Sequence, residues 1–390
     1  LRFVWGREIF ATMPERNVVI LHGSRARRLE LLADPKAEIF VINHDGVKVI
    51  QKELMARDDI DTLVLDELAV YRNNSDRSKA MRQVAARFNF VWGMTGRPMP
   101  NKPTDVWAQG RIVTPNTVPK YFNQARDLLM TRVNQYVWVP KPNAVETAFS
   151  LLQPSVRYSL EDILELPELI SRTVDVDLST QQTDTYNNMA KLFQAMVKEQ
   201  KITAVNAGAA MNKLLQVSLG WVYTSAPDFV KLDSGPRVDA LLDLVEAASH
   251  KVIVFVPYLH ALAGISEIFT KHGISHAVVH GGISDRDAIF NAFQNTSKYD
   301  VILAHPKCIA HGLTLTAADT IIWASPIADL EIYEQANARI RRPGQLHKQQ
   351  ILHLQSTPVE RKIYGLLRGK QKIQEQLLTL FEDATERRLS

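Results

Sequence analysis

The first third of the chain alternates short, continuously apolar runs with segments of helical periodicity. The apolar runs cover residues 17–21, 38–42, 62–65 and 88–92, and each is followed by polar or glycine residues. Continuous apolar strands separated by helices indicate a parallel sheet covered by helices on both faces. Such sheets bind ligands at the carboxyl ends of their strands, so the residues after each run are candidate functional residues.

Further along, the pattern predicts a helical middle and a second alternating unit. Long helical segments at 183–201 and 204–217 follow a strand-like piece at 172–178, and Pro227 and Gly235 predict a linker over 223–235. The expected strands of the second unit are 252–256, 276–279, 300–304 and 320–323. We therefore expect an α/β protein with lobe one over 1–182, a helical segment and linker over 183–234, and lobe two over 235–390.

Composition excludes only a few classes of protein. A chain of 390 residues is long enough for two or three domains. The formal net charge of +4, from 46 basic and 42 acidic residues, permits nucleic-acid binding without arguing for it. The single cysteine excludes an internal disulfide and a cysteine-cluster zinc site, and it fits a reducing, cytoplasmic compartment. No apolar run approaches the roughly 20 residues that a membrane span needs.

Two adjacent carboxylates, Asp66 and Glu67, follow the apolar run 62–65. Phosphoryl transfer to water needs a metal ion near the phosphates and a group that orients the attacking water. Neighbouring residues at a strand end can divide these tasks because their side chains diverge. An acidic pair at the start of a helix is the alternative interpretation of the same two residues.

A second candidate lies far downstream, where residues 335–345 read QANARIRRPGQ. Arg339 and Arg342 are three residues apart, so on a helix they would share one face. Paired arginines suit the phosphates of a nucleotide. A solvated basic face is the alternative for this run.

Together, residues 63–67 and 335–345 resemble motifs II and VI of the superfamily-two helicases, and the QxxxRxxRxGQ form is similar to the Swi/Snf-like branch. Residues 93–101 resemble motif III and residues 311–319 resemble motif V, in the family's order, although Arg97 and Thr314 stand where the family has threonine and asparagine. The resemblance implies two RecA-like lobes that hydrolyse ATP in the cleft between them. It also implies tracking along double-stranded DNA, as in compact phage and bacterial members.

The resemblance also implies residue roles. Asp66 would hold Mg²⁺ through its water shell, and Glu67 would polarise the attacking water. Arg339 and Arg342 would neutralise charge on the γ-phosphate. Nucleotide or coupling roles fall to five further residues, which are Thr95, Gly96, Gly312, Gln335 and Gln345.

One part of the family's machinery has no counterpart in the sequence, which contains no G-x-x-x-x-G-K-[ST] phosphate loop. The family carries this loop before motif II, and the chain begins with Leu1 rather than Met. We therefore expect lobe one to lack its Walker A strand and loop, and the chain alone to be inactive. Two alternatives stay open, namely a non-catalytic DNA-binding remnant and a strand-separating helicase of the same superfamily.

Three histidines, His272, His276 and His280, recur at helical spacing and suggest a metal site. We reject this site because Gly273 interrupts the helix and the segment reads as a strand.

Overall fold

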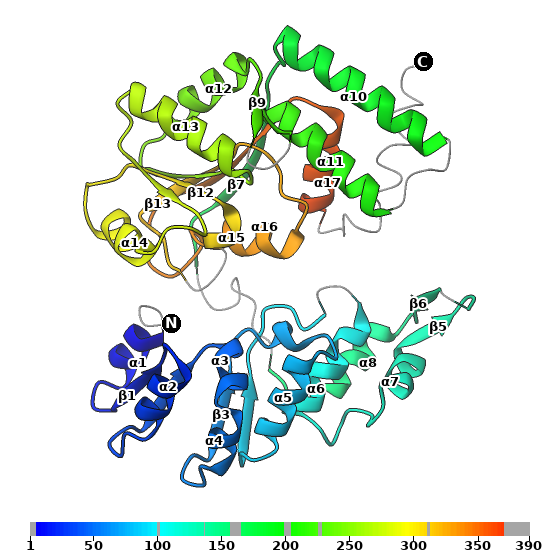
Figure 1. Cartoon of the computed structure of the whole chain (residues 1–390), viewed down its shortest axis with the longest axis vertical. Helices are drawn as coiled ribbons and strands as arrows, with labels where there is room; N and C mark the ends of the chain where they lie inside the picture. The colour runs from blue at the N-terminus through cyan, green and yellow to red at the C-terminus, as the bar shows by residue number, and fades with distance from the viewer. Residues whose placement is uncertain are drawn as a thin grey trace. The chain divides into compact units, whose positions relative to one another are not determined.

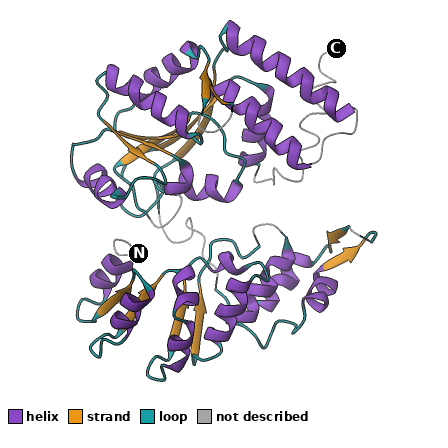
Figure 2. Cartoon of the chain, in the orientation of Figure 1, coloured by secondary structure: helices purple, strands orange, loops and turns teal. Residues whose placement is uncertain are grey.

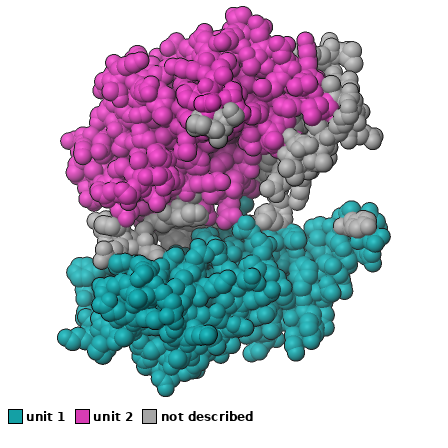
Figure 3. Space-filling model, in the orientation of Figure 1, with its two compact units in different colours: residues 1–159 teal, residues 160–390 magenta. Residues whose placement is uncertain are grey.

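The computed structural model describes residues 5–99, 102–135, 137–156, 165–198, 204–224, 228–309 and 313–369 (Figure 1). The chain forms two compact units, residues 1–159 and residues 160–390 (Figure 3). The sequence pattern instead places the end of lobe one at residue 182. The difference arises because the strand at Leu169–Asp175 pairs within the second unit.

Unit 1 contains two separate pairs of parallel strands. The first pair joins β1 (Val18–Leu21) to β2 (Ile39–Ile42), and the second joins β3 (Thr62–Leu65) to β4 (Phe90–Gly93). All four strands lie within two residues of their expected positions. The surrounding helices and 3-10 turns are α1 (Trp5–Thr12), α2 (Arg25–Leu32), α3 (His44–Val49), α4 (Gln51–Ala56), η1 (Leu68–Tyr71), α5 (Asp76–Ala85), η2 (Pro103–Asp105) and α6 (Val106–Val113).

A small helical subdomain completes unit 1. It consists of α7 (Phe122–Leu129), α8 (Ala144–Leu151) and the antiparallel hairpin of β5 (Met130–Arg132) with β6 (Trp138–Pro140). Its apolar cluster is separate from the cluster that packs against the parallel strands.

Within the described residues, the β3–β4 pair is covered by helices on one face only. Leu63 and Val91 pack into the unit's core, whereas Val64, Phe90 and Trp92 on the opposite face are 49%, 57% and 65% exposed. The register pairs Val64 with Trp92, so the exposed side chains form one continuous strip. For this pair, the prediction of helices on both faces is wrong among the residues that the structure describes.

Unit 2 is built on one six-stranded parallel sheet in the order β11-β12-β10-β13-β14-β7. The strands are β7 (Leu169–Asp175), β10 (Lys251–Phe255), β11 (His276–Val279), β12 (Val301–Ala304), β13 (Ala318–Trp323) and β14 (Gln349–Gln355). The sequence pattern predicts five of these strands and misses β14. The expected linker at 223–235 also contains structure, because β8 (Trp221–Tyr223) pairs with β9 (Phe229–Lys231).

Helices cover both faces of this sheet (Figure 2). On one face lie α12 (Gly235–Glu246) and α13 (Leu259–Lys271), which pack against the strands together with Val252 and Val254. The other face packs against α11 (Ala204–Leu219), α14 (Arg286–Asn295), α15 (Pro306–Ile309), α16 (Leu330–Asn337) and α17 (Pro358–Arg368). Ile253 and Phe255 point to this second face, so alternate residues of β10 serve opposite cores. The confirmed fold class is therefore α/β with a parallel sheet.

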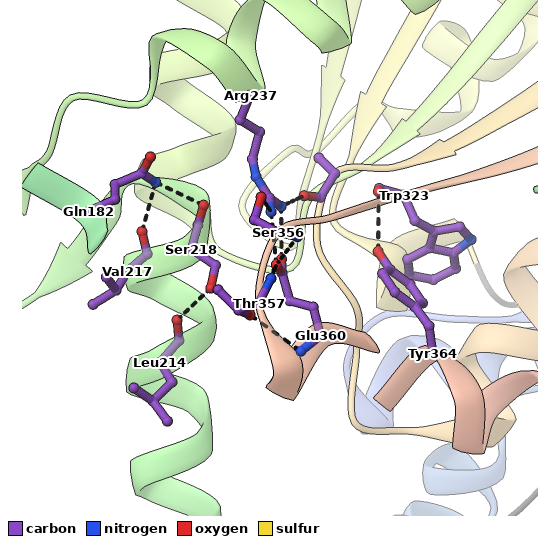
Figure 4. A network of polar contacts seen from close by, with 11 residues as sticks. Gln182, Leu214, Val217, Ser218, Arg237, Trp323, Ser356, Thr357, Glu360 and Tyr364 are labelled. Atoms are coloured by element: carbon purple, nitrogen blue, oxygen red, sulfur yellow. Dashed lines mark hydrogen bonds and ion pairs between the residues drawn. The ribbon is translucent and has the colours of Figure 1, made fainter. Parts of the chain in front are cut away.

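A buried polar network fastens the helices of unit 2 to the carboxyl ends of β13 and β14 (Figure 4). Arg237 of α12 donates to both carboxylate oxygens of Glu360 at 2.8 and 2.9 Å, and also to the carbonyl of Ala324. Thr357 caps α17 and lies 3.1 Å from the hydroxyl of Ser218 in α11. Buried hydrogen bonds thus connect the three helices α11, α12 and α17 to one another and to the ends of these strands.

The remaining long helix, α10 (Thr180–Lys198), is joined to α11 by Gln182, whose side-chain amide donates to two carbonyls at the end of α11. Among the described residues, no helix is both long enough and apolar enough to cross a membrane.

Candidate functional site

Asp66 and Glu67 lie directly after β3, at its carboxyl end, as the sequence predicts. The Asp66 side chain is exposed, and its Oδ1 accepts a 2.9 Å hydrogen bond from the amide of Glu67. Its Oδ2 accepts from the indole of Trp5 at 3.2 Å. Glu67 has φ 52° and ψ 52°, a left-handed conformation that side chains other than glycine seldom adopt. The pair therefore sits in a sharp turn between a strand and the 3-10 turn η1.

A half-buried histidine contacts the 3-10 turn that follows Glu67. Nδ1 of His44 lies 2.7 Å from the hydroxyl of the fully buried Tyr71, which belongs to η1. Burial is the main cause that lowers the pKa of His44, and Arg77 adds to it, so the ring is neutral near pH 7. Burial likewise raises the pKa of Tyr71, which stays protonated.

Thr95 and Gly96 follow β4, beside the end of β3. The Thr95 hydroxyl accepts a 3.4 Å hydrogen bond from the amide of Arg97. A side chain at Gly96 would meet no atom within 4 Å, whereas a Cβ at Gly93 would lie 2.6 Å from Leu68. Close packing against the turn therefore requires a glycine at 93 rather than at 96.

The two arginines do not lie on a helix, contrary to the sequence prediction. Helix α16 ends at Asn337, and Arg339 and Arg342 follow it in a series of turns. Four residues after Arg339 stands Pro343, which has no N–H to continue the helical ladder. The carbonyl of Arg339 accepts instead from the amide of Leu315 at 3.1 Å.

Both arginines nevertheless reach the same short segment. Nη1 of Arg339 donates to the carbonyl of Leu313 at 2.9 Å, and Nη1 of Arg342 lies 3.4 Å from the hydroxyl of Thr314. Nε of Arg339 donates to the carbonyl of Gln335 at 2.7 Å. Arg339 is only 5% exposed, whereas Arg342 is half-buried. The guanidinium of Arg339 thus joins the end of α16 to the segment before β13.

The polar residues around the arginines hold this segment together. Gln345 is buried, and its amide donates to the carbonyls of Ala318 and Ile340 at 2.9 and 3.1 Å. Gly344 has φ +91°, which explains a glycine at that position. Gly312 lies outside the described residues.

The structure separates the rejected histidines by their elements. Helix α13 ends at Lys271, Gly273 has φ +69°, and His276 begins β11. The sequence analysis missed His44 and Tyr71 as parts of the site, and it included Gly93 only within the motif III resemblance. His44 was visible as the residue following an apolar run, but no local signal connected it to Asp66.

Comparison with known families matches two models to the chain. The SNF2-related domain covers residues 2–223, and the helicase conserved C-terminal domain covers residues 236–344. The chain belongs to the SNF2-related family. It carries both domains of SNF2-family helicases, with Asp66 and Glu67 in the first match and the two arginines in the second.

Individual relatives are distant. Protein p41 of Acyrthosiphon pisum secondary endosymbiont phage 1 is 24% identical over 86% of this chain and 75% of its own length. An uncharacterized ATP-dependent helicase of Mycoplasma genitalium is 22% identical over 97% of this chain, and the human DNA annealing helicase and endonuclease ZRANB3 is 20% identical over 96%. The chain spans only 36% and 35% of these two relatives.

A solved structure of the Sulfolobus solfataricus SWI2/SNF2 ATPase core in complex with dsDNA is 19% identical. It aligns with 98% of this chain and 82% of its own, at a TM-score of 0.44.

Proposed function

We propose that this SNF2-family chain carries the water-activating and phosphate-sensing parts of a DNA-dependent ATPase that translocates on double-stranded DNA. The observation that carries the proposal is the pair Asp66 and Glu67 at the carboxyl end of β3, inside the SNF2-related match. The curated relatives include an ATP-dependent helicase and a DNA annealing helicase, which supports nucleotide hydrolysis coupled to DNA.

Asp66 suits a magnesium ion held through water. Its carboxylate is exposed at the strand end, and hard cations such as Mg²⁺ prefer oxygen ligands and keep several of their waters. When bound, Mg²⁺ would neutralise charge on the β- and γ-phosphates. Glu67, the neighbour of Asp66 in the same turn, would orient a water molecule and accept its proton. ATP and Mg²⁺ are therefore the proposed substrate and cofactor.

We assign different tasks to the two arginines. Arg339 is buried, and its guanidinium donates to two backbone carbonyls, so its main task is to position the segment at 313–317. Arg342 is more exposed and is the better candidate to contact the γ-phosphate. An arginine in that position accelerates phosphoryl transfer roughly 10³–10⁵-fold. That both carboxylates and Arg342 meet one ATP between the lobes is part of the proposal and rests on motif order.

The assay for this function is phosphate release with Mg-ATP, with and without duplex DNA. Residues 1–390 contain no phosphate loop, and positioning supplies most of the catalysis in this chemistry, so we expect no hydrolysis by this chain alone. A fusion that supplies a strand, a phosphate loop and a helix ahead of Leu1 should hydrolyse ATP when DNA is added. Glu67→Gln in the fusion should abolish turnover while leaving ATP binding intact.

Two outcomes would contradict this assignment. DNA-stimulated hydrolysis by residues 1–390 that Glu67→Gln abolishes would mean that other groups hold the phosphates. A fusion that binds ATP and DNA but never hydrolyses would favour the non-catalytic remnant.

DNA binding is tested separately on residues 1–390. Contacts mainly to phosphates predict affinity that falls steeply with salt and varies little with sequence. Translocation is tested on the phosphate-loop fusion with ATP. Displacement of a triplex-forming strand without unwinding of the duplex would support translocation, whereas unwinding would favour the strand-separating alternative.

A further inference from the structure

The carboxylate of Asp66 accepts hydrogen bonds from two different parts of unit 1. Oδ1 accepts from the amide of Glu67 at 2.9 Å, and Oδ2 accepts from the indole Nε1–H of Trp5 at 3.2 Å. A carboxylate held through one oxygen can still turn, whereas bonds to both oxygens fix its orientation. The bond from Trp5 is the informative one, because 61 positions separate it from Asp66 in the sequence.

Helix α1 holds the indole in place. Trp5 is the first residue of this helix and is half-buried, and Ile9, four residues later, is buried. Gly6 lies against β1, because a Cβ at this position would be 3.4 Å from Cδ1 of Ile20. The pairs β1–β2 and β3–β4 share no ladder among the described residues. The bond from Trp5 to Asp66 therefore connects two parts of unit 1 that no strand pairing joins.

The donor that Trp5 supplies is neutral, and this favours a cation site. An indole N–H donates one hydrogen bond and cannot accept one, so it orients a carboxylate without adding a charge. A lysine or arginine in its place would form an ion pair with Asp66 and compete with a metal ion. A carboxylate has about four lone-pair sites, so two hydrogen bonds do not exhaust its acceptors. Trp5 thus leaves the exposed Asp66 side chain able to accept from metal-bound water.

We propose that Trp5 is a positioning residue that holds the Asp66 carboxylate in the orientation needed to bind Mg²⁺ through water. This inference rests on the proposed role of Asp66, but the orientation of the side chain does not depend on hydrolysis. Trp5 acts through Asp66 and contacts neither the metal ion nor the phosphates.

The first test reads the indole N–H of Trp5 by NMR in residues 1–390 labelled with ¹⁵N-tryptophan. The chain has six tryptophans, and the resonance that disappears in Trp5→Phe is that of Trp5. Asp66→Ala removes the acceptor, so this resonance should move upfield and its exchange with water should become faster. Asp66→Asn keeps an acceptor oxygen without the charge, so it should move the resonance only part of the way.

Glu67→Gln is the matched control, because it alters the neighbouring carboxylate and should leave the Trp5 resonance in place. The indoles of Trp107 and Trp323 donate to acceptors elsewhere in units 1 and 2, so their resonances should stay fixed and report that each unit is folded. An unchanged Trp5 resonance in Asp66→Ala, or an equal shift in Glu67→Gln, would overturn the proposal.

The second test measures binding of Mn²⁺, which shares with Mg²⁺ a preference for carboxylate and water ligands. Electron paramagnetic resonance of the free ion gives the dissociation constant. The chain should bind Mn²⁺ at a site that Asp66→Ala removes, and Trp5→Phe should weaken this binding roughly tenfold, because the partner that orients the ligand is lost. Trp92→Phe, the same substitution at an exposed tryptophan of unit 1, should leave binding unchanged.

The two tests separate this inference from the proposed function. Mn²⁺ binding that depends on Asp66 but is not weakened by Trp5→Phe would overturn the inference. If Asp66→Ala removes no Mn²⁺ site, the metal role proposed for Asp66 is wrong, and the indole resonance alone then decides whether Trp5 orients this side chain.

Discussion

The two units place their candidate functional residues on very different scaffolds. In unit 2, a six-stranded sheet is covered on both faces, and Ile253, Phe255 and Trp323 have no exposed surface. In unit 1, the strand that precedes Asp66 has one partner among the described residues, and one face of that pair exposes Phe90 and Trp92.

The difference shows two ways to hold a functional segment. In unit 2, the segment with Arg339 and Arg342 lies beside a sheet covered on both faces. The Arg339 side chain is held there by hydrogen bonds to the backbone carbonyls of Gln335 and Leu313. In unit 1, the turn with Asp66 and Glu67 follows a two-stranded sheet. Side-chain hydrogen bonds such as that between His44 and Tyr71 therefore contribute more to holding the residues around this turn. An exposed apolar sheet face of this kind also favours association with another apolar surface.

The largest expected effect compares two tryptophans that occupy similar places near the ends of their strands. Trp323 in β13 is fully buried and donates to Asn337, whereas Trp92 in β4 is 65% exposed. Trp323→Ala should destabilise unit 2 by about 3–5 kcal/mol. Trp92→Ala should change the stability of unit 1 by less than about 1 kcal/mol. Urea unfolding followed by hydrogen exchange in each unit measures the change in unfolding free energy caused by each substitution. Equal losses of stability in the two units would contradict the difference between the two scaffolds.

A similar effect is expected from the buried ion pair of unit 2. Arg237→Met leaves Glu360 charged and buried, and should destabilise the unit by about 3–5 kcal/mol. The double variant Arg237→Met with Glu360→Leu should recover much of this loss, because no unpaired charge remains. The exposed pair of Arg361 and Asp175 is the control, and Arg361→Ala should cost at most about 1 kcal/mol. A double variant as unstable as the single one would refute the explanation by an unpaired charge.

A smaller effect should appear as a loss of unit 2 stability in acid. Burial lowers the pKa of His353 to about 4, from an ordinary value near 6.5, and its ring is held by Tyr333 and the carbonyl of Arg172. The unfolded chain binds the proton more readily, so the stabilisation is complete above pH 6.5 and is lost as the pH falls toward 4. The loss should be on the order of 3 kcal/mol. His353→Asn should flatten the difference in unfolding free energy between pH 6.5 and 4, and an unchanged slope would contradict it.

The smallest change in stability is expected at the exposed strip, where the measurable effect is association. Replacing Phe90 and Trp92 with threonine removes the two most exposed large side chains of the β3–β4 pair and keeps its β-propensity. Sedimentation of residues 1–390 should then show less self-association at high concentration, with unit 1 as stable as before. Leu346 is also highly exposed but lies in unit 2, so Leu346→Thr is the control that should leave association unchanged.

Much of the local structure could be predicted from the sequence. The apolar runs at 62–65 and 252–256 coincide with β3 and β10 to within one residue, because a continuous apolar strand is encoded in adjacent positions. The location of Asp66 at a strand end follows from the same local pattern. Strand β14 was missed because its sequence, QQILHLQ, is rich in glutamine. The side-chain amides of Gln349 and Gln355 donate to Pro167 and Asp175, which are contacts that only the tertiary structure provides.

The pairing of strands and the positions of the arginine side chains could not be predicted in the same way. The strand at 169–175 was recognisable, but its pairing with β14 depends on residues about 180 positions away. The spacing of Arg339 and Arg342 suggested one helix face, whereas the chain ends α16 early and brings both side chains to residues 313–314. Their convergence was predicted for the wrong local reason.

The sequence by itself determined the family, since adjacent carboxylates after an apolar run and an arginine pair beside a Gly-Gln are properties of neighbouring residues. Only the tertiary structure decided how those groups are held. Pro343 removed a helical hydrogen bond, and a distant carbonyl–amide contact replaced it. The left-handed turn at Glu67 is held by hydrogen bonds to its neighbouring peptides, since the carbonyl of Met94 accepts from the amide of Leu68 and the Asp66 side chain accepts from the amide of Glu67. The contact with Met94 joins segments so far apart in the sequence that no periodic pattern in the chain reveals it.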